Sequence, residues 1–108
     1  MDLTNKKCVP CENGGEPFDA ETIHTYLADT PGWHVIDGKK IVREFEFKDF
    51  VRAISFVNKV ADIAETEGHH PDIHINYNKV KLELWTHAVG GLMENDFIVA
   101  AKINKMEA

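Results

Sequence analysis

Long hydrophobic runs are missing from this sequence of 108 residues: the longest, such as Phe97 to Ala101, are far too short to span a bilayer. No apolar stretch follows Lys6 and Lys7, so the N-terminus does not read as a signal peptide. Basic residues are scarce, since 12 Lys and Arg stand against 18 Asp and Glu for a net charge of −6, which disfavours binding to nucleic acid or to an anionic membrane. We therefore expect a soluble, cytoplasmic protein with no nucleic-acid or membrane partner.

Cysteine is also rare, and the two that occur form Cys8-Val9-Pro10-Cys11. A C-x-x-C pair is typical of a redox motif or of half a zinc site. A redox pair needs the start of a helix after a buried strand, whereas these neighbours are rich in Lys, Asn and Gly, and no second cysteine pair completes a zinc site. We expect residues 1–17 to be a flexible N-terminal tail, tied to the core by no amphipathic pattern, in which the cysteines are incidental or bind metal weakly.

The remaining residues, 18–108, have the length of one domain with a real core and are too few for two. Predicted helices run from the cap Asp19 to Pro31-Gly32, over 49–67, and after Gly90-Gly91; predicted strands cover 33–36, 40–47, 73–77 and 80–85. Two hairpins without a β-α-β crossover imply a single-domain α+β fold in the order α-β-β-α-β-β-α, with a four-stranded antiparallel sheet and helices packed on one face.

The helix predicted over 49–67 is apolar on more than one stripe. Its expected core face consists of Phe50, Ile54, Val57, Ala61 and Ala64, flanked by Val51, Phe56, Val60 and Ile63. A small domain has little capacity to bury both sets, and a four-stranded sheet has two open edges. We expect at least a homodimer that pairs sheet edges, with a homotetramer through helix packing as the alternative.

Four of the six histidines fall between the carboxylates Glu65 and Asp96, and three of them, His69, His70 and His87, lie at the ends of predicted elements. If the second hairpin packs beside the long helix, the start of one strand and the end of its antiparallel partner are adjacent, so these histidines meet at one edge of the sheet. Histidine titrates nearest to neutral pH, so converging imidazoles favour proton transfer or metal binding.

Two alternatives to a proton-transfer site stay open on the residues alone. Adjacent histidines in a loop are often exposed and idle. Three histidines and a carboxylate are also a legitimate zinc ligand set, although neighbouring His69 and His70 suit tetrahedral geometry poorly and no HExxH pair is present.

The ordered motif Glu65-x-x-x-His69-His70-Pro71, with Tyr77-Asn78-Lys79-Val80, Thr86-His87, Gly91-Leu92 and Asp96, resembles the signature of the pterin-4a-carbinolamine dehydratases. Gly32-Trp33 before a hairpin and the run from Phe45 to Ala53 are similar to that family too, so the resemblance covers about residues 18–105. The cysteine-containing tail resembles the N-terminal extension of some bacterial members. Met93 departs from the pattern, since members often have Ser or Thr there, and this puts a local helix cap in doubt.

The resemblance implies dehydration of 4a-hydroxytetrahydrobiopterin to quinonoid dihydropterin, which recycles the cofactor of aromatic amino acid hydroxylases. His69, His70 and His87 are then the general acid and base catalysts, and neither a metal nor a further cofactor is expected. Glu65 and Asp96 would orient imidazoles or hold the pterin.

Trp33, Pro71 and Thr86 complete the substrate site that the resemblance implies. Trp33 would stack on the flat ring, although a core residue at the start of a strand is an equal reading. The implied partners are a pterin, further copies of the chain and a functionally linked phenylalanine hydroxylase. The alternative is a non-catalytic protein-binding module of the transcriptional coactivator or assembly chaperone type, but an intact His-His…His set favours catalysis.

Overall fold

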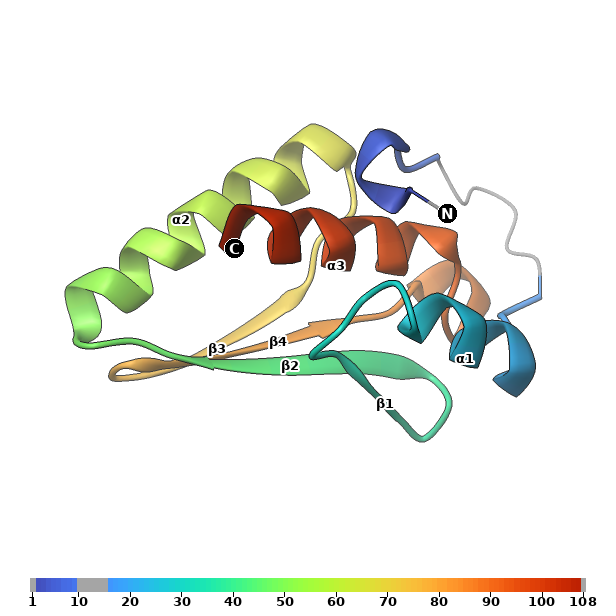
Figure 1. Ribbon diagram of the computed structural model, residues 1–108, viewed down its shortest axis with the longest axis horizontal. Coiled ribbons are helices and arrows are strands. Elements are labelled where there is room, and N and C mark those ends of the chain that lie inside the picture. The colour runs from blue at the N-terminus through green and yellow to red at the C-terminus, as the bar shows by residue number, and fades with distance from the viewer. Residues whose placement is uncertain (1, 10–15, 108) are drawn as a thin grey trace.

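Two long helices cross one face of an antiparallel sheet in this computed structural model, which describes residues 2–9 and 16–107 (Figure 1). The elements in chain order are η1 Leu3–Asn5, α1 Ala20–Leu27, β1 His34–Ile36, β2 Lys40–Glu46, α2 Phe50–Glu67, β3 Asp72–Asn76, β4 Lys79–Leu84, η2 His87–Val89 and α3 Glu94–Glu107. The strand order is β1-β2-β4-β3, and every neighbouring pair is antiparallel. The predicted α+β fold class and element order are confirmed.

Local chemistry sets the predicted helix ends. The Asp19 side chain accepts a hydrogen bond from the Thr22 N–H at 2.8 Å and so caps α1. Asp49 does the same for the N–H of Arg52 at the start of α2. Gly68 ends α2 in the left-handed conformation, with φ of 67°, which a residue without a Cβ adopts at little cost.

Strand register builds the inner face of the sheet. Ile41 of β2 pairs with Leu84 of β4, and Phe45 pairs with Val80 four residues along. All four side chains are buried. Because alternate residues of a strand share a face, this register points one apolar row of each central strand toward α2 and α3. The core therefore lies between the sheet and these two helices.

The stripe of α2 that faces the core differs from the predicted one. Ala53, Phe56, Val60 and Ala64 are buried, whereas Phe50 is 48% exposed. Of the predicted face, only Ala64 is buried, so that prediction is wrong in detail. The helix is apolar over a wide arc, and packing selects among its stripes: the Phe56 ring centroid lies 4.6 Å from that of Phe45 on β2.

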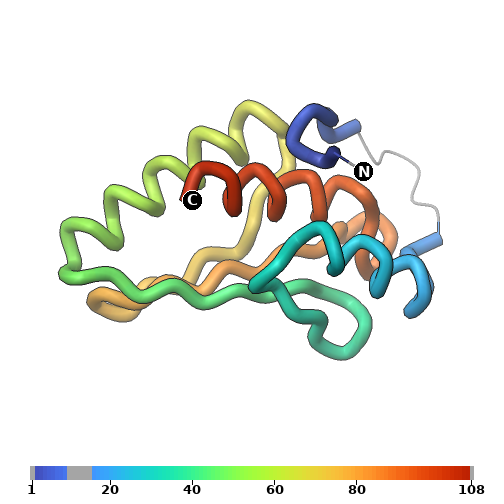
Figure 2. The backbone as a smooth tube through the Cα atoms, viewed as in Figure 1, coloured from blue at the N-terminus to red at the C-terminus, as the bar shows by residue number. Residues whose placement is uncertain are grey.

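Residues 2–9, the described part of the predicted N-terminal tail before residue 16, pack against the core. Leu3 is 2% exposed and belongs to the hydrophobic core cluster, and η1 contacts α3. The tube trace shows this segment beside the end of α2 and over the start of α3 (Figure 2). The prediction of a flexible tail that no amphipathic pattern ties to the core did not anticipate this contact, because one buried leucine is too short a signal to form such a pattern. The prediction for Cys11 lies outside the described residues.

The helices of the described part of the chain include none that combines the length and apolar character needed to cross a bilayer.

Candidate active site

Three elements deliver the predicted site residues to one end of the sheet. His69 and His70 follow the last turn of α2 and lead into β3. Thr86 follows β4, where its N–H donates to the carbonyl of Gly91 at 2.7 Å and closes a short loop. Asp96 lies in the first turn of α3. Strand pairing brings the loop after α2 and the loop after β4 to the same end of the sheet, but His69, His70 and His87 contact different partners there and the predicted convergence of the three rings is not seen among the described residues.

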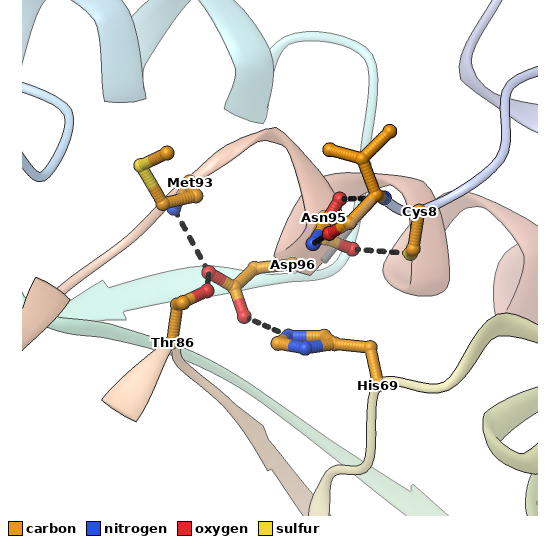
Figure 3. A network of polar contacts seen from close by, with 7 residues as sticks. Cys8, His69, Thr86, Met93, Asn95 and Asp96 are labelled. Carbon is orange, nitrogen blue, oxygen red and sulfur yellow. Dashed lines mark hydrogen bonds and ion pairs between the residues drawn. The ribbon is translucent and has the colours of Figure 1, made fainter. Parts of the chain in front are cut away.

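Asp96 is the hub of the site (Figure 3). Its side chain is 0% exposed, and its Oδ1 lies 2.6 Å from Nε2 of His69. Its Oδ2 accepts hydrogen bonds from the Thr86 hydroxyl at 2.8 Å and from the Met93 N–H at 2.9 Å. A buried carboxylate with three partners is held in one orientation, and it holds the imidazole in turn.

This geometry assigns the tautomer of His69. The Asp96 oxygen is a hydrogen-bond acceptor, so Nε2 of His69 carries the hydrogen and donates it. The remaining nitrogen, Nδ1, then has the lone pair in the neutral ring. The His69 side chain is 13% exposed, so the ring is largely enclosed.

The start of α3 is capped without a hydroxyl at position 93. The Asp96 carboxylate reaches back to the Met93 N–H, and the Asp96 N–H donates to the Met93 carbonyl at 3.2 Å. This is the half of a capping box in which an acidic side chain binds the backbone before the helix. Methionine in place of Ser or Thr at position 93 therefore leaves the hydrogen bond from the Met93 N–H to Asp96 in place.

His70 and His87 have other partners. Nε2 of His70 lies 2.6 Å from a carboxylate oxygen of Glu65, and both side chains are exposed. The His87 ring is exposed and lies against Trp85, with ring centroids 3.8 Å apart. The structure thus joins His69, Thr86 and Asp96 in one network, with Glu65–His70 as a separate ion pair at the same loop.

Trp33 lies apart from this network. It is buried, and its Nε1–H donates to Oδ1 of Asn104 at 2.9 Å. Asn104 is eight residues beyond Asp96 on α3, which is about 12 Å along the helix. The core reading of Trp33 fits this placement, and Trp85 is the tryptophan that lies beside a site histidine. Pro71 is half-buried directly after His70, where it directs the chain into β3.

Two observations concern the residues that the zinc and redox alternatives would use. Among residues 2–9 and 16–107, no three His, Cys, Asp or Glu side chains converge to hold a metal ion. Burial and the nearby Glu67 carboxylate raise the pKa of Cys8 to about 12. The Cys8 thiol is therefore neutral at physiological pH, whereas redox exchange uses the thiolate.

Sequence reasoning missed Glu67 and Asn95, which lie next to the site. Glu67 is two residues before His69 and is buried against Lys102, with Nζ and Oε2 2.6 Å apart. Asn95 directly precedes Asp96, and its side chain binds the backbone of Val9. Neither residue forms part of the motif that carries the resemblance, so only their adjacency to His69 and Asp96 could have marked them.

Known proteins resemble this chain along nearly its whole length. The family model described as Pterin 4 alpha carbinolamine dehydratase matches residues 16–106. A Halorhodospira halophila protein that carries the pterin-4-alpha-carbinolamine dehydratase name is 44% identical over 109 residues, covering 100% of each chain. Pterin-4-alpha-carbinolamine dehydratase 2, mitochondrial, from Arabidopsis thaliana is 46% identical over 98% of this chain and 59% of its own length. The crystal structure of a transcriptional coactivator/pterin dehydratase from Brucella melitensis matches with a TM-score of 0.80 and 34% identity, over 86% of this chain and 100% of that one.

Proposed function

The chain belongs to the pterin-4a-carbinolamine dehydratase family, and we propose that it is a hydro-lyase that converts 4a-hydroxytetrahydrobiopterin to quinonoid dihydropterin and water. The observation that carries the proposal is the buried contact of 2.6 Å between Asp96 and His69, two residues of the motif by which the chain resembles this family. It turns a loop histidine into an oriented proton-transfer group.

The proposed reaction removes one proton from a ring nitrogen of the pterin and gives one proton to the hydroxyl that leaves from C4a as water. The C4a–O bond breaks, a C=N bond forms, and no electrons enter or leave. We assign the base to Nδ1 of His69, because Nε2 is bound to Asp96, whose carboxylate stabilises the imidazolium that forms. The exposed rings of His70 and His87 supply the proton to the leaving hydroxyl, since solvent can reprotonate them. The scheme requires neither a metal nor a further cofactor.

Turnover of the carbinolamine, coupled to a pterin-dependent hydroxylase, tests this proposal. His69→Ala, His70→Ala and His87→Ala should each lower the dehydration rate by about 10²-fold or more, the usual contribution of a general acid or base. His24→Ala, on the exposed face of α1, is the matched control and should keep the wild-type rate. Wild-type rates in all three site variants, with dehydration limiting, would show that the site is wrongly assigned.

We also propose that the chain works as a homodimer, or as a homotetramer built from dimers. Within the described chain β3 is an edge strand, and Ile75 on it and Tyr77 beside it are exposed. An open edge with apolar side chains tends to pair with another strand. Light scattering at micromolar concentration should give a mass above that of a monomer, and Ile75→Lys should lower it; a clean monomer mass for the wild type would refute the assembly.

We also propose that the protein works in the cytoplasm and is functionally linked to a phenylalanine hydroxylase. The alternative function, a protein-binding module, gains one observation: the related Brucella melitensis protein is described as both a transcriptional coactivator and a pterin dehydratase. The same turnover assay separates the two, because a pure binding module would not accelerate dehydration.

A further inference from the structure

The segment of residues 2–9 connects the two helix ends that carry the site. Leu3 anchors it in the core, packed against α3. Lys6 adds an exposed ion pair of 3.0 Å with Glu94, the first residue of α3. The segment then runs to Cys8 and Val9, which reach both the end of α2 and the start of α3.

Asn95 clamps the end of this segment to α3. Its Oδ1 accepts a hydrogen bond from the Val9 N–H at 3.1 Å, and its Nδ2 donates to the Val9 carbonyl at 2.6 Å. The Cys8 thiol lies 3.6 Å from the Asn95 carbonyl, to which it donates. Figure 3 shows the side chains of Asn95 and Asp96 leaving α3 in different directions, one toward Cys8 and the other toward His69.

Glu67 makes the matching contact at the end of α2. Its Oε1 accepts the Cys8 N–H at 3.0 Å, and its Oε2 lies 2.6 Å from Nζ of Lys102 on α3. Burial would by itself raise the pKa of Glu67, but hydrogen bonds from Lys102 and from Cys8 outweigh it, so the pKa lies below its ordinary value. The carboxylate is therefore charged at neutral pH and holds both donors, while its side chain is only 5% exposed.

A single residue, Gly68, links Glu67 to His69, and the N–H groups of Gly68 and His69 both donate to the carbonyl of Ala64 on α2, at 2.8 and 3.3 Å. The backbone of His69 is therefore tied to the last turn of α2, so the position of its imidazole relative to Asp96 depends on how the end of α2 lies against the start of α3. Glu67 makes its contacts from the first of these helix ends, and Asp96 binds His69 from the second.

We propose that residues 2–9 form a strap that fixes the end of α2 against the start of α3, and that Asn95 and Glu67 are positioning residues for the pair His69–Asp96. The inference rests on the proposed function, because positioning matters only if this pair transfers a proton. The strap and the pair span the same two helix ends, so loosening the strap lets the His69–Asp96 contact lengthen. A misplacement on the order of 1 Å lowers a catalysed rate by up to about 10²-fold.

Asn95→Ala in the full-length chain tests the strap, with Asn58→Ala on the exposed face of α2 as the matched control. We expect Asn95→Ala to lower kcat between about 10- and 100-fold with little change in KM, since the pterin contacts themselves are left in place. A ¹H–¹⁵N spectrum of the histidine rings should show His69 as the Nε2–H tautomer in the wild type and as a mixture in the variant. Asn58→Ala should change neither.

Val9→Pro is the second variant, in case Asn95→Ala does not fold. It removes the backbone N–H that donates a hydrogen bond to Oδ1 of Asn95. Because Val9 is 65% exposed, the substitution removes no core packing, and we expect kcat to fall by less than in Asn95→Ala. Unchanged kcat and an unchanged His69 tautomer in a folded variant would overturn the strap. If the wild type does not dehydrate the carbinolamine, the proposed function fails, and the ring spectra still decide whether the strap positions His69.

Discussion

Replacing Asp96 with asparagine changes one atom of the site hub and leaves its shape. The two donors to Oδ2, the Thr86 hydroxyl and the Met93 N–H, require an acceptor at that position. The amide of Asp96→Asn therefore turns its oxygen toward them and its NH₂ toward Nε2 of His69. A donor there forces His69 into the opposite tautomer, with hydrogen on Nδ1 and the lone pair on Nε2.

The size of the effect follows from which bond is lost. Two hydrogen bonds survive with a neutral acceptor, and the carboxylate–imidazole bond of 2.6 Å becomes a neutral one. Hydrogen bonds to charged groups contribute about 1.5–3 kcal/mol, so we expect the free energy of unfolding to fall by about 2 kcal/mol. In a domain of this length that lowers the Tm by roughly 8–16 °C.

The rate should fall much further than the stability. Nδ1 of His69 can no longer accept the pterin proton, so the loss is at least the roughly 10²-fold contribution of a general base. The same Asp-to-Asn change in a serine protease triad, which also imposes the wrong histidine tautomer, lowers kcat by about 10⁴-fold. We expect a value between these limits.

The assay is single-turnover dehydration of the carbinolamine at a temperature well below the lowered Tm, together with the ring ¹H–¹⁵N spectrum of His69. Asp62→Asn, an exposed aspartate on α2, is the matched control and should leave the rate, the Tm and the spectrum unchanged. A wild-type rate in Asp96→Asn, with the Nδ1–H tautomer of His69 populated, would refute the assignment of His69 as the base.

Three further predictions follow from other parts of the structure. Leu3→Ala should lower the free energy of unfolding, measured by urea titration, by about 2–3 kcal/mol, because Leu3 is buried in the core. Lys7→Ala, at an exposed position, is the control and should change it little. Equal effects of the two substitutions would contradict the packing of Leu3 in the core. Hydrogen bonding from Lys40, together with other nearby cations, lowers the pKa of Glu83, so its contribution to stability is present above the ordinary glutamate pKa and is lost as the pH falls through the lowered value. Below about pH 4.3, the Tm of Glu83→Gln should therefore depend less on pH than the wild-type Tm does. Parallel curves of Tm against pH for the two proteins would show that the ion pair contributes nothing to stability. Chelation with EDTA should leave the dehydration rate unchanged, whereas loss of activity with removal of a stoichiometric metal would indicate a metalloenzyme.

The sequence names the candidate site residues but does not say which of them contact one another. The spacing from Glu65 to Asp96 named the residues, and topology placed the loops after α2 and β4 together. The sequence could not assign which imidazole faces Asp96, because His69 and His70 are neighbours and each has a carboxylate within reach. Folding pairs His69 with buried Asp96 and His70 with exposed Glu65.

The sequence by itself determined what depends on neighbouring residues. Side-chain periodicity and local caps such as Asp19, Asp49 and Gly68 established the order of helices and strands, and two tight hairpins made the sheet antiparallel. Periods of two and of 3.6 residues, together with caps, act within a few positions along the chain, so they can be read without knowing the fold.

Only the tertiary structure decided what depends on residues far apart in the chain. Three features require the assembled sheet and α3: the choice of the buried stripe of α2, the core position of Trp33 and the docking of residues 2–9. The contact of His69 with Asp96 spans 27 positions and that of Val9 with Asn95 spans 86. No local pattern encodes such pairs, because their energy arises only when the packed core brings the two segments together.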